Sequence, residues 1–87
     1  MLSGYVVDYV ADMFFDYLIE RGVSRSTAKQ YKHVAKRIMR GLAPNTDVDP
    51  DTLRTRKTGV ILFKRFVTEY MDFFRQRGVD LSFVLDF

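Results

Sequence analysis

The sequence predicts an all-α fold, a small helical bundle of three to four helices, and three observations carry this prediction. Apolar residues recur at helical spacing in three stretches, near residues 5–21, 25–42 and 58–77. No stretch alternates apolar and polar residues as a half-buried strand does. Apolar residues make up 47% of the 87 residues, enough for the single core of one domain spanning residues 1–87.

The first predicted helix covers residues 5–21 and carries an acidic stripe. Its four acids follow one another at i, i+4 spacing: Asp8, Asp12, Asp16 and Glu20. We interpret the stripe as a solvated face, or as a face that forms ion pairs with basic helices, rather than as a catalytic site. Gly22 supplies the left-handed position that ends such a helix, and Val23 supplies the apolar contact of this cap.

The second predicted helix runs from about Arg25 to Leu42, with Ser24 as its N-cap and with Gly41 and Pro44 at its end. Its basic or titratable residues fall within an arc of about 140°. This basic arc consists of Arg25, Lys29, Lys32, His33, Lys36, Arg37 and Arg40. A separate apolar arc consists of Ala28, Tyr31, Val34, Ala35, Ile38, Met39 and Leu42. The second helix is therefore expected to bury one face and to present cations on the other.

Residues 43–49 read as an acidic loop, and Asp49-Pro50 is a favourable start for a helix. A long helix is expected to end near Arg77. Because Gly59 interrupts its beginning, the pattern leaves open whether residues 50–58 form a separate element. The last residues, 79–87, form a hydrophobic tail that either covers its own core or docks on a neighbouring molecule.

Charge is segregated along the chain in a way that favours a polyanionic partner. Residues 23–43 contain six Lys and Arg and no acid, and residues 54–66 contain five and no acid. Duplex DNA carries a charge every ~1.7 Å along its axis, so a rigid row of cations on a helix matches it. A plain solvated face is the alternative. Binding to a membrane is disfavoured because the apolar arc is needed for the core.

An enzyme is not expected, because the parts of a catalytic site are missing. His33 is the only histidine, there is no cysteine, and no Gly-rich phosphate loop is present. The acids Asp47 and Asp49 lie in the predicted loop, where capping or solvent exposure explains them better than catalysis does. We therefore expect no metal site and no cofactor.

Two segments of the chain resemble a known family. One reads Phe15-Asp16-Tyr17-Leu18 and then Arg21-Gly22-Val23-Ser24, followed by Thr27-Ala28 and Tyr31; the other reads Ile61-Leu62-Phe63-Lys64-Arg65-Phe66, followed by Tyr70 and Phe73-Phe74. This order is similar to the core-binding (SAM-like) DNA-binding domain of tyrosine recombinases and phage-type integrases. The spacing is most similar to that of integrases from archaeal viruses and plasmids. The similarity covers about residues 10–78.

The resemblance implies a helical domain that forms one half of a clamp around a recombination site, in the host cytoplasm and associated with the nucleoid. In that family the second and last helices face the DNA. The residues of this chain at the matching positions are the candidate DNA contacts. They are Arg25, Lys29, Lys32, His33, Lys36, Arg37, Arg40, Arg54, Arg56, Lys57 and Lys64. The expected partners are double-stranded DNA, a recombinase catalytic domain, or a second copy that associates through the tail.

The chain departs from the family in two respects. The family's third helix has only residues 43–54 available to it, and the catalytic domain has no counterpart. The tyrosines Tyr9, Tyr17, Tyr31 and Tyr70 are expected in the core, and Tyr5 lies near an end. The chain is therefore expected to be a separated recombinase domain or a stand-alone relative. A helical protein-interaction module and a small helix-turn-helix-like viral or plasmid regulator remain as alternatives.

Overall fold

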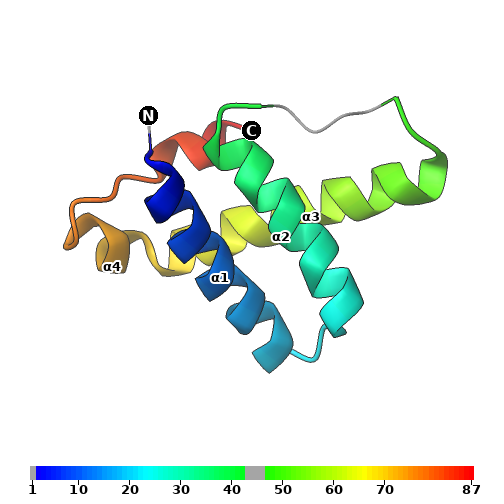
Figure 1. Ribbon diagram of the computed structural model, residues 1–87, viewed down its shortest axis with the longest axis horizontal. Coiled ribbons are helices and arrows are strands. Elements are labelled where there is room, and N and C mark those ends of the chain that lie inside the picture. Colours follow the sequence, from blue (N-terminus) through cyan, green and yellow to red (C-terminus); the bar gives the residue numbers. More distant parts are fainter. Residues whose placement is uncertain (1, 43–46) are drawn as a thin grey trace.

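The computed structural model describes residues 2–42 and 47–87, and this part of the chain contains helices and no strands. The elements are α1 (Gly4–Glu20), α2 (Arg25–Met39), α3 (Pro50–Glu69), α4 (Met71–Arg75) and the 3-10 helix η1 (Ser82–Asp86). The predicted all-α bundle is thus confirmed. Helices α1 and α2 form an antiparallel pair, and α3 crosses both of them (Figure 1). The expected loop at residues 43–46, with Pro44 as a helix stop, lies outside the described residues.

The predicted caps at Ser24 and Asp49 are confirmed. The hydroxyl of Ser24 accepts a hydrogen bond from the Thr27 amide at 3.3 Å, and the carboxylate of Asp49 accepts one from the Thr52 amide at 2.7 Å. These bonds satisfy amides that have no partner within their own helix. The bond from Thr52 also holds the pKa of Asp49 below its usual range.

The second helix is shorter than predicted. Helix α2 ends at Met39, and Gly41 takes the left-handed conformation at φ 76° that a C-terminal cap requires. Leu42 therefore lies beyond the helix and is 47% exposed, so its expected place on the apolar arc is wrong. The cap replaces the last helical turn because glycine reaches positive φ without the steric cost that other residues meet.

Residues 50–58 are not a separate element, since α3 runs unbroken from Pro50 through Gly59. Gly59 is the point of closest approach between α3 and α2. A Cβ at this position would lie 3.1 Å from Cδ1 of Tyr31 and 3.3 Å from Cβ of Val34. The absence of a side chain therefore sets how closely α3 packs on α2.

The prediction of one helix from residue 58 to 77 is wrong at its C-terminal part, because α3 ends at Glu69 and α4 begins after Tyr70. The helix is interrupted at Tyr70, which has φ −109° and ψ 17°. The ring of Phe74 is buried 6.0 Å from that of Phe66. Phe73 stays half-buried.

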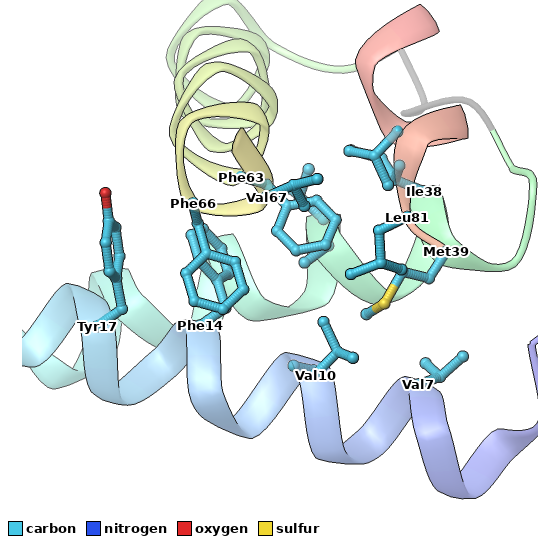
Figure 2. Close-up of a cluster of buried hydrophobic side chains, with 14 of the residues drawn as sticks. Val7, Val10, Phe14, Tyr17, Ile38, Met39, Phe63, Phe66, Val67 and Leu81 are labelled. Carbon is cyan, nitrogen blue, oxygen red and sulfur yellow. The ribbon is translucent and has the colours of Figure 1, made fainter. Parts of the chain in front are cut away.

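The core lies where α1, α2, α3 and the tail meet. Figure 2 shows Phe14 of α1 pointing toward Phe63 and Phe66 of α3, and the ring centroids are 5.0 and 5.4 Å apart. The tail completes this core, since Leu81 and Val84 are fully buried. Of the two roles considered for the tail, covering its own core is therefore the one observed.

The tyrosines divide between the core and the surface. Tyr17 is buried as predicted, and Tyr31 and Tyr70 are partly buried against the core. Tyr9 is 47% exposed, so its expected place in the core is wrong. Tyr9 follows the exposed Tyr5 by one helical turn, so the two tyrosines lie on the same face of α1.

Candidate nucleic-acid interface

One edge of the basic arc is fastened to α1 by ion pairs. Nζ of Lys32 lies 2.5 Å from Oδ1 of Asp12, and Nζ of Lys36 lies 3.3 Å from Oδ1 of Asp8. Both lysines are half-buried, whereas the two carboxylates are mostly exposed. The interpretation of the acidic stripe as an ion-pairing face is confirmed for Asp8 and Asp12. Asp16 and Glu20 continue the stripe as exposed residues.

The other edge of the arc borders a groove of about 540 Å³ between α2 and the first half of α3. The groove is lined by Gln30, His33, Val34, Arg37, Asp51, Thr52, Thr55 and Arg56. His33 and Arg37 are exposed at its α2 side, and Arg56 is half-buried at its α3 side. Arg56 is therefore a candidate from α3 that the structure brings next to the candidates of α2.

The middle of the arc is exposed along the length of α2. Arg25, Lys29 and Arg40 are all exposed, and Arg25 and Arg40 are separated by about 22 Å along the axis at 1.5 Å per residue. The guanidinium of Arg25 lies 5.7 Å from the ring centroid of Phe15, a contact that orients this side chain at the helix N-terminus. The arrangement is a row of cations on a rigid helix whose opposite side is in the core.

Arg54, Lys57 and Lys64 lie on a different face of the molecule. They are positioned about 140–160° around the α3 axis from Gly59, at 100° per residue, and Gly59 is the contact with α2. These side chains therefore point away from α2. The structure brings together the arc of α2 and Arg56, but not the other three candidates of α3.

A second polar cluster, which the sequence does not reveal, links the C-terminal ends of α1 and α3. The hydroxyl of Tyr17 donates a hydrogen bond to Glu69. The guanidinium of Arg21 lies 3.6 Å from the Tyr17 ring centroid and 3.5 Å from the Glu69 carboxylate. Burial and the bond to Glu69 raise the pKa of Tyr17. Since Arg21 is engaged here, it is not counted among the cations of the candidate interface.

Within residues 2–42 and 47–87, no three His, Asp or Glu side chains are grouped so that they could hold a metal ion. No helix in the same ranges has both the length and the apolar character needed to cross a membrane.

The fold and the surface define a class, a small helical protein with an exposed cationic helix. Comparisons with protein-family models, with curated proteins and with solved structures find no match.

Proposed function

We propose that the protein binds double-stranded DNA, with the exposed face of α2 against the phosphate backbone. The observation that carries the proposal is that α2 contains no acid while its cations are exposed along about 22 Å. Neutralising phosphates with lysine and arginine releases condensed counterions, which is the main source of sequence-independent affinity for DNA. The apolar side of α2 is used by the core, so its basic side is the one available to a partner.

On this proposal, the neighbouring charges favour one position of the duplex. The acidic stripe repels phosphate on the α1 side, and there Lys32 and Lys36 are held by carboxylates. On the other side the groove presents His33 and Arg37. The duplex is therefore expected over the middle of α2 and toward the groove, where Asp51 is the one acid among the lining residues.

The resemblance to the core-binding domain of tyrosine recombinases supports the same proposal, because that domain binds duplex DNA. On this proposal the chain contributes DNA contacts to site-specific recombination or integration, or acts as a stand-alone relative, and it performs no chemistry itself. The residue pattern of the resemblance includes Ser24 and Thr27, and in the structure these residues form the N-cap of the basic helix.

A protein-interaction module is the second candidate function, and one surface feature favours it. A shallow depression of about 220 Å³ is lined by Tyr5, Val6, Tyr9, Phe74, Arg77 and Val79. Its two exposed tyrosines are of the kind that occurs in protein interfaces. Since this depression is separate from the basic arc, variants at the two places distinguish the two functions.

Fluorescence anisotropy with a labelled duplex of about 20 base pairs tests the proposal at several salt concentrations. If Arg25, Lys29, Arg37 and Arg40 each contact one phosphate, log K falls against log[salt] with a slope of roughly −4. The variant Lys29→Gln/Arg40→Gln removes two contacts, so the slope is expected to become shallower by about 2 and the affinity to fall at least tenfold at about 0.1 M salt.

The matched control is Lys57→Gln/Arg65→Gln, which changes the net charge equally but on the outer face of α3. It is expected to change the affinity less than about threefold, since the two positions are on the other side of the molecule and are screened by salt. Equal losses in the two variants, or no loss in Lys29→Gln/Arg40→Gln, would refute the assignment of the interface to α2.

A further inference from the structure

The outer face of α3 carries a second group of cations. From Thr52 to Thr68 the helix contains no acid. Arg54, Lys57 and Arg65 are exposed, and Lys64 is half-buried. They surround Ile61, which is 58% exposed although it lies in the middle of a long helix. We call these five residues the α3 outer face.

The α3 outer face and the basic arc of α2 point in opposite directions. Tyr31 and Val34 of α2 pack against Gly59 of α3. Lys29 lies on the side of α2 away from this contact, just as Lys57 lies on the side of α3 away from it. The molecule extends only 20 Å along its shortest axis, and Figure 1 is viewed down that axis, with α3 crossing the α1–α2 pair. Two cationic surfaces thus lie on opposite faces of a thin molecule.

We propose that the α3 outer face is a second DNA-binding surface, so that one molecule joins two duplexes. The proposal rests on the proposed function for the first duplex, which α2 binds. The charge of the second surface is complementary to a polyanion, and its cations recur along about three turns of one helix, between Arg54 and Arg65.

Physical magnitudes favour two duplexes over one that wraps around both faces. Duplex DNA has a persistence length of about 150 base pairs, so a short duplex on α2 does not turn back to reach α3 at a modest cost. The Debye length is about 8 Å at physiological salt and rises to about 14 Å at 0.05 M, still less than the thickness of the molecule. Since the molecule is 20 Å thick, the charge of the first duplex is largely screened at the opposite face. The two duplexes therefore repel each other only weakly across the protein.

Binding to the second surface is expected to be weaker than binding to α2. The α3 outer face offers three exposed cations and one half-buried lysine, whereas α2 presents Arg25, Lys29, Arg37 and Arg40 as exposed cations and borders a groove. With three phosphate contacts, log K for the second duplex falls against log[salt] with a slope of roughly −3. Joining of duplexes is thus expected at about 0.05 M salt.

Energy transfer between two duplexes measures the joining directly. Donor-labelled and acceptor-labelled duplexes of about 20 base pairs are mixed and titrated with the full chain at about 0.05 M salt. Transfer is expected to rise until one molecule is present for two duplexes and then to fall, because excess protein gives every duplex its own molecule. Transfer that instead rises steadily with protein would indicate self-association and would overturn the proposal, as would its absence throughout the titration.

The variant Lys57→Gln/Arg65→Gln tests whether the α3 outer face is the surface that binds the second duplex. Each electrostatic contact contributes about fifteenfold to affinity at 0.05 M salt, so losing two weakens the second site by ~200-fold and should abolish transfer. Binding of a single duplex should change less than about threefold. The matched control, Arg75→Gln/Arg77→Gln, has the same net charge and lies outside α3; it should retain transfer. Persistent transfer in Lys57→Gln/Arg65→Gln would overturn the proposal.

Anisotropy on the same samples separates failure of this inference from failure of the proposed function. Binding of one duplex that depends on Lys29 and Arg40, without transfer, overturns the second surface and leaves the first standing. Duplex binding that is indifferent to Lys29 and Arg40 overturns both, because the joining of two duplexes requires a site on α2.

Discussion

Replacing Asp8 and Asp12 by asparagine removes the two carboxylates that hold Lys36 and Lys32 against α1. In the structure each lysine must leave its carboxylate before it contacts a phosphate. The side chains of Asp8 and Asp12 are 61% and 65% exposed, and ion pairs at such exposed sites contribute about 0.2–1 kcal/mol each. This free energy is subtracted from DNA binding in the native protein.

The double variant Asp8→Asn/Asp12→Asn is therefore expected to bind duplex DNA more tightly, by about 0.4–2 kcal/mol, or roughly two- to thirtyfold. The salt dependence should become steeper by up to about two units, because two further lysines are free to displace counterions. The free energy of unfolding is expected to fall by no more than about 2 kcal/mol, the sum of the two ion pairs. Anisotropy gives the first two quantities and urea denaturation gives the third.

The control for this experiment is Asp72→Asn/Asp86→Asn, which raises the net charge equally. Both aspartates are exposed, in α4 and η1, and neither forms an ion pair with α2. Their replacement should change the affinity less than about twofold, since their field is screened within about 10 Å at 0.1 M salt. Equal gains in the two double variants would show that net charge alone acts, and no gain in either would refute the competition between carboxylate and phosphate.

Three further predictions concern stability. Ser24→Ala removes the acceptor of the Thr27 amide and should lower the free energy of unfolding by about 1 kcal/mol, and an unchanged urea midpoint would contradict this. Phe66→Ala empties the site of a fully buried ring and should cost about 3–5 kcal/mol, so a near-neutral result would place that ring outside the core. Burial and the bond to Glu69 raise the pKa of Tyr17, so the native state holds this proton more tightly than the unfolded chain. The contribution of protonated Tyr17 to the free energy of unfolding is complete below about pH 10 and is lost as pH rises through the native pKa. Urea midpoints at about pH 9 and about pH 11 should show a smaller alkaline loss in Tyr17→Phe than in the native protein.

Local chemistry made much of the fold predictable from the sequence. The N-caps at Ser24 and Asp49 and the helix end at Gly22 depend on residues within one turn, and all three are confirmed. The break at Tyr70 was not predictable in this way, because no glycine or proline marks it. Apolar periodicity does not mark it either, since at 100° per residue an unbroken helix would also keep Phe74 between Phe63 and Val67 on the buried face.

The composition of the basic arc was predictable, but its surroundings were not. Helical periodicity places Lys32 and Lys36 on one face of α2, whereas their pairing with Asp12 and Asp8 depends on how α1 lies beside that face. The separation of Lys57 from the arc depends in turn on the crossing of α3 over α2 at Gly59. Both are properties of tertiary packing, which periodicity along one helix does not contain.

The most direct test of the account is to map the DNA-binding surface residue by residue. Amide chemical shifts of the ¹⁵N-labelled protein are recorded while a duplex of about 20 base pairs is added in substoichiometric amounts at about 0.1 M salt. The account predicts that the largest shifts occur in α2, from Arg25 to Arg40, and at Arg56 across the groove. Shifts confined to Tyr5, Tyr9 and the tail, or no shifts at any residue, would contradict the claim that α2 is the surface that binds DNA.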